Sequence, residues 1–487
     1  MAQQVVLAID EGTTNCKVVM VAASGEIIAS GSAPVPIEHP RSGWVQQDAG
    51  EIWAATQQAI TACRNAAPVV EIVALGISSQ RESVLVWDRR TGAPLGPVVS
   101  WQCRRTSAAC AALRDAGHEP EVIARTGLPL DPMFPSTKIR WLLDNHGHAS
   151  GDVCIGTVDS WLIWMLSGGK VHATDRSNAA RTQLFNLSEG AWDASLCALF
   201  DIDMRMLPEV RDSSGLFATT LGADVVPDGI PIASAIGDSH AALFGHGAFR
   251  IGDGKITFGT GSSVMSTLRE FIVPPTGVTT TIAWSMNGQS TYALEGNILV
   301  SAAILPWTAE LLGLASVEAL LALAEQVPDA NGVALVPAHV GLGAPHWKSE
   351  ARGLICGLSF GAKPAHIARA AAESMAYQVL DVYEIMEAAG EGFGRLFVDG
   401  GPSRNRFLMQ IVANALDHPV TPCRNSEASA LGAAHLAGLA VGFWPDLDCV
   451  ARLSAHDQDI SPKMPEDLRQ IDIARWHKAV AGTLAAL

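Results

Sequence analysis

The chain has 487 residues, more than one ordinary domain, and can bury large cores. Apolar residues make up 48% and charged residues 17%, which excludes a disordered, collagenous or coiled-coil protein. The 33 Lys+Arg and 49 Asp+Glu give a net charge of −16, which argues against nucleic acid or an anionic membrane surface as the main partner. We therefore expect a globular protein that binds a small molecule and neither nucleic acid nor membrane.

The cysteines and the apolar runs indicate the compartment. Nine cysteines are scattered and never spaced C-x-x-C, so neither a disulfide framework nor a zinc site is indicated. The apolar run Val5–Ile9 stops at Asp10, too early for a signal sequence or a membrane span. We interpret the small and apolar stretch Ala428–Trp444 as one tightly packed helix. We expect a cytoplasmic protein.

The first half of the chain predicts strands separated by turns and helices. Val5–Ile9 and Lys17–Val21 are apolar runs suited to two strands joined by a tight turn. Apolar spacing predicts a helix over 51–66, and further strands are predicted over 72–77 and 230–236.

The second half repeats the opening plan. Residues 255–258 and 264–265 flank the turn Gly259–Ser263 as two strands, which suggests a duplicated architecture. Strands are also predicted over 333–336 and 396–398, and helices over 364–389 and 407–416. This alternation predicts α/β layers, and the turn residues at 245–254 divide the chain into lobes 1–247 and 248–487 with a ligand between them.

Three turns could hold phosphate. The turn Asp10–Thr14 offers backbone N–H groups and hydroxyls with Lys17 after it, and Gly259–Ser263 offers a similar set. The segment Asp399–Asn405 follows a strand and opens a helix, whose N-terminus favours an anion. The alternatives are an ordinary hairpin with a solvated Lys17 and a plain strand-to-helix turn. None of the turns is a P-loop or a Rossmann fingerprint.

A second group of polar residues could bind and activate a hydroxyl. Asp238 closes a strand beside glycine, where it could accept a proton, although an Asp there could instead cap the helix that follows. Arg81 and Glu82 could bind the hydroxyls of a polar ligand, with Trp101 as a flat wall. Their alternative is a buried ion pair beside a core indole. The histidine spacing indicates no transition metal.

The order of these motifs resembles the FGGY carbohydrate kinases, and among them the glycerol kinases. The similarity spans almost the whole chain and rests on eleven strings in order: Ala8–Thr14, Ser42–Val45, Ser79–Ser83, Trp101–Thr106, Gly156–Trp164, Gly237–Asp238, Phe258–Gly261, Ala293–Gly296, Gly341–Pro345, Asp399–Gly401 and Ala430–Ala434.

The resemblance implies two actin-like, ribonuclease-H-like lobes around a central cleft that holds ATP, Mg²⁺ and a small polyol or sugar. It implies Asp238 as general base, Asp10 as the residue that orients magnesium, and Arg81, Glu82 and Trp101 around the acceptor. The residues implied at the nucleotide are Gly12, Thr13, Thr14, Lys17, Thr260 and Gly261 at the phosphates and Gly401 and Asn405 at the adenosine. Phosphoryl transfer needs mainly positioning, charge neutralisation and exclusion of water, which two closing lobes provide. We also expect a homo-oligomer, either a dimer or a tetramer.

The departures from the glycerol kinase pattern lie where acceptor specificity is set. Met133, Ser239 and Ser263 stand where glycerol kinases usually carry Tyr, Gln and Phe. Losing two rings and one amide enlarges the pocket, so a tetritol, pentitol or pentulose becomes the alternative to glycerol. Ala302 and Pro306 replace a Gly and a Gln near the nucleotide and alter contacts to ADP.

These observations lead to one main hypothesis and two rivals. The main hypothesis is an ATP-dependent kinase of a small polyol or sugar. An actin-like or chaperone-like ATPase would share the phosphate turns but has no need of Arg81, Glu82, Trp101 and Asp238. A catalytically silent binding protein is disfavoured because both Asp10 and Asp238 are present.

Overall fold

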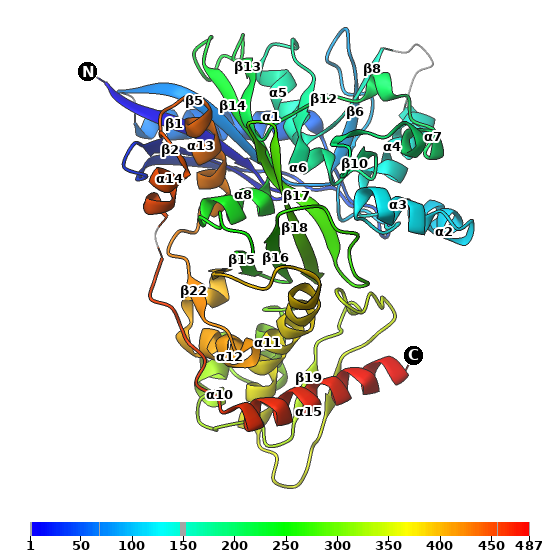
Figure 1. Ribbon diagram of the computed structural model, residues 1–487, viewed down its shortest axis with the longest axis vertical. Coiled ribbons are helices and arrows are strands. Elements are labelled where there is room, and N and C mark those ends of the chain that lie inside the picture. Colours follow the sequence, from blue (N-terminus) through cyan, green and yellow to red (C-terminus); the bar gives the residue numbers. More distant parts are fainter. Residues whose placement is uncertain (1, 68, 147–151, 455, 487) are drawn as a thin grey trace.

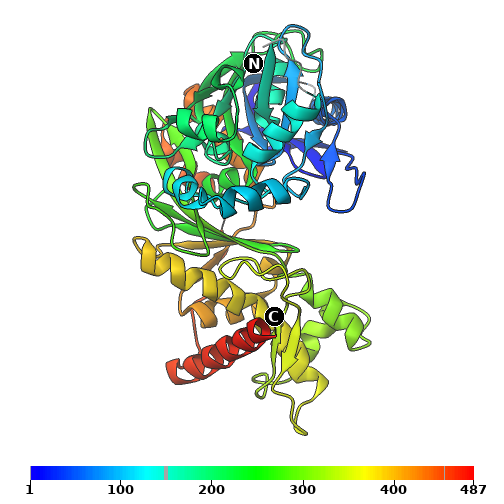
Figure 2. The same ribbon diagram turned by 90° about the vertical axis from the view of Figure 1, so that its right-hand side faces the viewer.

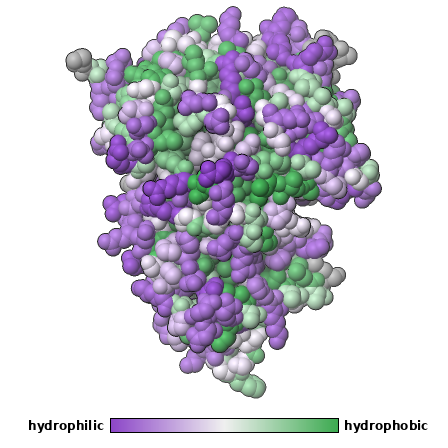
Figure 3. Space-filling view, in the orientation of Figure 1, coloured by the Kyte–Doolittle hydropathy of each residue, from purple (hydrophilic) through white to green (hydrophobic). Residues whose placement is uncertain are grey.

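A computed structural model describes residues 2–67, 69–146, 152–454 and 456–486 of the chain. The molecule has two parts along its long axis, one built mainly from the first half of the sequence and the other from the second (Figures 1 and 2). Polar residues cover much of the face in Figure 3, with apolar groups interspersed among them. No helix within the described ranges is long and apolar enough to cross a bilayer.

The first sheet brings together strands from the first half of the chain in the order β3-β2-β1-β5-β14-β13. Strand β1 pairs antiparallel with β2 and parallel with β5, and β5 pairs parallel with β14. The predicted strand, tight turn and strand at the start of the chain are confirmed as β1 and β2. The bounds are β1 Gln3–Glu11, β2 Asn15–Ala22, β3 Ile27–Pro34, β5 Val70–Ser79, β13 Ser214–Thr219 and β14 Pro231–Gly237.

The second sheet repeats this plan in the order β17-β18-β16-β15-β21-β22. Strand β15 pairs antiparallel with β16 and parallel with β21, so the expected duplication is confirmed. One pair, Ser214 with Met286, joins the edges of the two sheets into a twelve-stranded sheet. The bounds are β15 Gly254–Phe258, β16 Ser262–Leu268, β17 Thr279–Met286, β18 Gln289–Ile298, β21 Leu396–Gly400 and β22 Val420–Pro422.

Two long helices form where the sequence predicts them. The helix predicted over 51–66 is α1, which packs on β3 and β2, and α11 spans the predicted range 364–389. Asp48 accepts hydrogen bonds from two N–H groups at the start of α1, and a proline opens α11. The bounds are α1 Ala49–Ala66, α8 Asp238–Gly245, α11 Pro364–Ala389, α12 Arg406–Leu416, α13 Ala428–Ala440 and α15 Glu466–Ala485.

The remaining elements lie outside the first and second sheets. They are β4 Gln46–Gln47, β6 Val84–Asp88, β7 Val98–Val99, α2 Ser107–Asp115, α3 Glu119–Thr126, α4 Pro135–His146, β8 Val153–Thr157, α5 Val158–Leu166, β9 Ala173–Asp175, α6 Arg176–Ala179, β10 Phe185–Asn186, β11 Ala191–Trp192, α7 Ala194–Leu199, β12 Glu209–Arg211, α9 Ile304–Leu311, α10 Val317–Ala324, β19 Ala334–Val336, β20 Leu354–Cys356 and α14 Leu447–Leu453, with short 3₁₀ turns at Met204–Met206 and Gly401–Arg404.

Helix α13 lies on the first sheet although it comes late in the sequence. It packs against α8, β5, β1 and β14, and Figure 1 shows it beside the N-terminal strands. A Cβ at Gly432 would lie 1.9 Å from the carbonyl oxygen of Ala241 in α8, so only glycine allows the two helices this approach. The division at residue 247 stays a prediction. It assigns α13 to the second lobe, although α13 packs on the first sheet.

The prediction of one helix over 428–444 is wrong at its end. Helix α13 ends at Ala440, and Gly442 adopts a left-handed φ of +73° that turns the chain. Trp444 then folds back onto the helix at Gly438 and donates a hydrogen bond to the carbonyl of Ala23 at 3.0 Å. The indole of Trp444 is thus buried against the last turns of α13 and does not extend the helix.

Gly432→Ala should destabilise the protein by about 1–3 kcal/mol, because the added methyl collides with the backbone of α8. Thermal unfolding monitored by circular dichroism measures the loss. The matched control is Gly482→Ala in α15, where the new Cβ would meet its nearest neighbour at an ordinary 3.6 Å. Equal melting temperatures for the two variants would contradict the close α8–α13 contact.

Candidate functional site

Three parallel strands of the first sheet end at one edge and bring the acidic site residues together. Asp10 pairs with Ser78, and Gly237 pairs with Ser79, so the residues that follow β1, β5 and β14 share that edge. The Ser78 hydroxyl donates to the Asp10 carboxylate at 2.8 Å. Asp10, Arg81 and Asp238 therefore lie at one edge of the first sheet.

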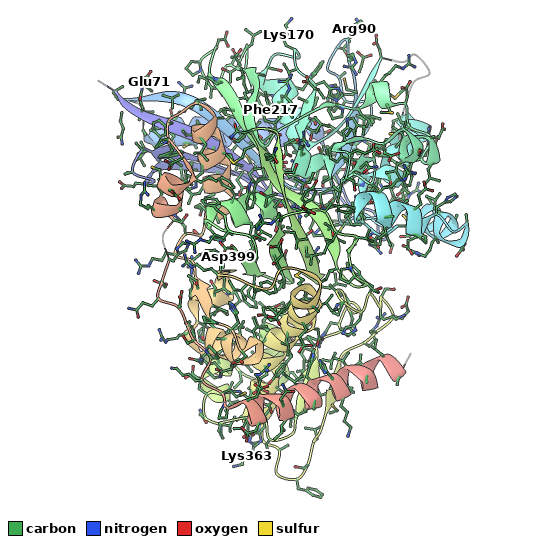
Figure 4. All side chains as sticks on the ribbon, in the orientation of Figure 1. Glu71, Arg90, Lys170, Phe217, Lys363 and Asp399 are labelled. Carbon is green, nitrogen blue, oxygen red and sulfur yellow. The ribbon has the colours of Figure 1, made fainter. Side chains whose placement is uncertain are left out.

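The two glycine turns of the second sheet also share one edge. Phe258 at the end of β15 pairs with Gly400 at the end of β21. A Cβ at Gly400, whose φ is +89°, would lie 2.0 Å from the Phe258 carbonyl oxygen, so this approach requires glycine. Asp399 is labelled near the junction of the two parts in Figure 4. Ala302 adjoins the first of these turns, because its N–H donates to the Gly259 carbonyl at 3.0 Å.

The turn after β1 is held by side chains from elsewhere in the chain. Trp101 Nε1 donates to the Thr13 hydroxyl at 2.9 Å, so the indole is half-buried and fixed to the turn rather than part of a core. Lys17 Nζ lies 2.5 Å from the carboxylate of Glu427, just before α13. The alternative of a solvated Lys17 is wrong, because Glu427 pairs with this ammonium group.

Asp238 is the first residue of α8 rather than its N-cap, which is Gly237. The N-cap alternative is therefore wrong, although the Asp238 carboxylate accepts a hydrogen bond from the Ser239 N–H at 2.6 Å. Its side chain is 39% exposed. Withdrawal from water raises the pKa of Asp238 above its ordinary value, and Arg81 opposes that rise.

Arg81 and Glu82 are held by charged partners that sequence reasoning missed. Arg81 Nε lies 3.3 Å from Asp238, and Arg81 Nη2 lies 2.8 Å from Glu295. Glu82 pairs with Arg181 at 2.6 Å. The alternative of an Arg81–Glu82 ion pair is thus replaced by pairs with other residues. Glu295 lay inside one of the motif strings, whereas no motif marked Arg181.

Two of the three specificity positions, Ser239 and Ser263, are connected through Met265. The Ser239 hydroxyl contacts Met265 Sδ at 3.5 Å, and Ser263 precedes Met265 by two residues on the same face of β16. The Ser263 hydroxyl is buried and has no hydrogen-bond partner in the part of the chain that the structure describes. The carbonyl of Met133 accepts a hydrogen bond from Lys138 Nζ at 2.5 Å.

Lys138 connects the two segments expected at the acceptor. Its ammonium also donates to the Glu82 carbonyl at 3.2 Å, and Glu82 has a left-handed φ of 60°. Burial lowers the pKa of Lys138 to about 7, partly offset by Glu82. Lys138 is a second functional candidate that sequence reasoning missed.

The residues expected at the adenosine lie at the start of α12. Gly401 is exposed and open on the side where a Cβ would project. Asn405 caps α12 by accepting a hydrogen bond from the Leu408 N–H at 3.0 Å. The amide oxygen of Asn405 is therefore engaged by the helix, and a nucleotide would meet its NH₂ group.

The carboxylates at the first turn repel one another. Withdrawal from water raises the pKa of Asp10 to about 7, and Asp238 and Glu427 add to the rise while Ser78 and Lys17 reduce it. Burial raises the pKa of Glu11 to about 8 despite its hydrogen bond from Gln80. A cation would relieve this repulsion.

Magnesium fits Asp10 as a partner. Across the described residues, no group of three or more His, Cys, Asp or Glu side chains could hold a metal ion. Mg²⁺ is commonly bound by one or two carboxylates, water and the phosphates of a substrate. Asp10 supplies one such carboxylate near the end of β1.

Comparison with known proteins identifies the class of this fold and site. Residues 5–245 match the N-terminal domain of the FGGY family of carbohydrate kinases, and residues 254–441 match its C-terminal domain. Apulose kinase of Pectobacterium atrosepticum is 44% identical over 489 residues, covering 99% of this chain and 98% of that protein. Glycerol kinase of Stenotrophomonas maltophilia is 44% identical over 497 residues, covering 100% and 99%.

Solved structures agree with this class. The Plasmodium falciparum glycerol kinase with ADP superposes with a TM-score of 0.95 at 30% identity, covering 99% of this chain and 98% of that one. The xylulose kinase of Rhodospirillum rubrum, at 24% identity and a TM-score of 0.90 over 98% of both chains, shares the fold.

The chain belongs to the FGGY family of carbohydrate kinases. It has the expected actin-like, ribonuclease-H-like kinase fold and is a phosphotransferase that acts on an alcohol group of a sugar or polyol. These relatives favour the kinase hypothesis over the ATPase and the silent binding protein.

Asp10→Asn should stabilise the ligand-free protein at pH 8 by about 1–2 kcal/mol and have little effect at pH 5. The reason is that the native Asp10 carboxyl holds its proton to higher pH than the unfolded one, so its contribution to stability falls as pH rises from about 4 to about 7. Urea unfolding at both pH values measures the difference. Glu26→Gln, which removes an exposed carboxyl, should give no pH-dependent gain, and an equal gain in both variants would contradict the assignment.

Proposed function

We propose that this kinase transfers the γ-phosphoryl group of ATP to a hydroxyl of a polyol or ketose larger than glycerol, with Asp238 as general base. The observation that carries the proposal is the position of Asp238, a partly exposed carboxylate at the edge shared with Asp10 and Arg81. Its raised pKa makes it a stronger proton acceptor than an ordinary aspartate.

The residues around Asp238 have complementary roles in the proposed reaction. Arg81 and Glu82 bind and orient the acceptor hydroxyls, and Trp101 forms a wall fixed to the phosphate turn by its bond to Thr13. Asp238 accepts the proton of the attacking hydroxyl as its oxygen approaches the phosphorus. Orientation of these groups contributes to the rate by holding the two reactants together.

The proposed nucleotide site uses turns from both sheets. Gly12, Thr13, Thr14 and Lys17 approach the phosphates from the first sheet, and Thr260 and Gly261 from the second. The ADP named in the Plasmodium structure supports a nucleotide in this family of folds. Asp10 would hold Mg²⁺, which neutralises phosphate charge when bound. Gly401 and Asn405 are proposed at the adenosine, and Ala302 beside the second turn.

The proposed acceptor follows from the small residues near Asp238. Ser239 and Ser263 present short side chains. The Ser263 hydroxyl has no hydrogen-bond partner among the described residues, so it can bind a further acceptor hydroxyl. Met133 completes the set in place of a ring. Relatives named apulose kinase and glycerol kinase are equally similar at 44% identity, so the choice rests on these side chains.

We propose a cytoplasmic setting for the protein. All nine cysteines are free, as expected in a reducing compartment such as the cytoplasm. Assembly into a dimer or tetramer stays a prediction.

Asp238→Asn should fold normally and lose about 10²–10⁴ in kcat, because the amide cannot accept the hydroxyl proton. A coupled ADP-release assay at saturating ATP and acceptor measures the loss. The control is Asp48→Asn at the start of α1, where Asn also caps the helix and activity should not change. Near-normal turnover by Asp238→Asn would reject the base.

A screen of glycerol, tetritols, pentitols and ketoses should give the highest kcat/KM with an acceptor of four or five carbons. Ser263→Phe should shift the ratio of efficiencies toward glycerol by about 10-fold or more, because the ring fills the added space. If glycerol is by far the best acceptor of the unmodified enzyme, the enlarged pocket is wrong.

A further inference from the structure

Five charged side chains form one continuous chain of ion pairs beside the acceptor site. Asp238 contacts Arg81 at 3.3 Å, and Arg81 contacts Glu295 at 2.8 Å. Glu295 contacts Arg181 through its other oxygen at 2.9 Å, and Arg181 contacts Glu82 at 2.6 Å. The charges alternate in sign, and both ends of the chain are carboxylates of the acceptor site.

Glu295 is the centre of this chain and comes from the other sheet. It lies on β18, while the four other residues come from the first half of the protein. Its side chain is fully buried, so a substrate cannot reach it. Burial alone would raise the pKa of Glu295, yet Arg181 and Arg81 hold that pKa below its ordinary value, and the carboxylate stays ionised.

Arg181 reaches both segments expected at the acceptor. Its Nε donates to Glu82, and its guanidinium lies over the ring of Phe134, 5.2 Å from the centroid. Phe134 follows Met133, one of the specificity positions. Arg181 is therefore placed to fix the orientation of the Glu82 carboxylate relative to this segment.

Stability alone is a poor explanation for so many buried charges. Burying each charge costs desolvation energy, which its partner only partly repays, and apolar replacements of buried ion pairs are often neutral or stabilising. Glu295 instead fixes the orientation of Arg81. It binds Nη2 of the guanidinium, so that Nε faces Asp238. This sharing keeps Arg81 from forming a two-pronged pair with Asp238, which would block the carboxylate.

We propose that Glu295 and Arg181 are positioning residues that set the geometry of Asp238 and Glu82 for the acceptor. The inference rests on the proposed function, because it takes these two carboxylates as the groups that meet the acceptor hydroxyls. Glu295 orients Arg81, which contacts Asp238, and it orients Arg181, which contacts Glu82. One carboxylate of the second sheet therefore aligns two carboxylates of the acceptor site.

Glu295→Gln should lower kcat/KM for the best acceptor by about 30-fold or more, because it breaks two buried charged pairs. The KM for ATP should change by less than about 3-fold, because the four ion pairs include none of the residues proposed at the phosphates. Steady-state kinetics with each substrate varied in turn separates the two effects.

Glu373→Gln is the matched control. Glu373 is a buried carboxylate between two arginines in the second part of the molecule, at 2.8 Å from Arg369 and 3.1 Å from Arg475. Its replacement should lower the melting temperature while leaving the constants for acceptor and ATP unchanged. Parallel kinetic losses in Glu295→Gln and Glu373→Gln would overturn the inference.

Arg181→Lys provides the test should Glu295→Gln fail to fold. Lysine keeps the charge but lacks the planar fork that reaches both Glu82 and Glu295. We expect the same selective loss of acceptor efficiency, and an unchanged acceptor efficiency would overturn the inference.

A double-mutant cycle measures the coupling between one end of the chain of ion pairs and its centre. Glu82→Gln and Glu295→Gln should combine to less than the sum of their separate effects on acceptor efficiency, and additive effects would count against the chain. Normal turnover by Asp238→Asn would instead reject the proposed base, so the two failures are distinguishable.

Discussion

The parallel pairing of β1, β5 and β14 is the constraint on which the site depends. Parallel strands end at the same edge, so the residue that follows each strand is delivered to one place. Asp10, Arg81 and Asp238 are far apart in sequence and become neighbours through this register alone. The second sheet repeats the pattern with β15 and β21, which places two glycine turns together. A one-residue slip in either register would shift the strand ends relative to one another and separate the residues that follow them.

The same edge concentrates negative charge that the fold leaves partly uncompensated. Burial raises the pKa values of Asp10, Glu11 and Asp238, and neighbouring carboxylates add to each rise. Lys17 opposes the rise at Asp10, and Arg81 and Lys255 oppose it at Asp238. An anionic nucleotide would meet this field only with a cation and with backbone N–H groups. A protein whose net charge is −16 thus relies on local geometry to bind phosphate.

Most of the fold could be predicted because strands and helices leave local signals. The apolar runs around Asp10 and Gly259 predicted both hairpins, and the range of α11 was predicted to the residue. The end of α13 could not be predicted, since composition alone does not reveal that Trp444 packs back on Gly438. Tertiary packing ended the helix before its apolar pattern did.

The site residues that belong to local sequence motifs could be predicted. Their partners from remote parts of the sequence could not. Arg81, Glu82 and Asp238 were found beside glycine turns and strand ends. Arg181 lies 99 residues from Glu82 and had no local pattern to mark it. Trp101 was expected as a wall, and its bond to Thr13 joins two turns that are 88 residues apart in the sequence.

The position of α13 governs how the chain can be assembled during synthesis. Val6 and Ala8 on β1 share a buried cluster with Ala430 and Ala433 of α13, so the first strand made is covered by nearly the last helix. A nascent chain leaving the ribosome must therefore carry that apolar face open to water until residue 440 has emerged. The N-terminal half is thus the part of the chain that needs protection from aggregation for longest.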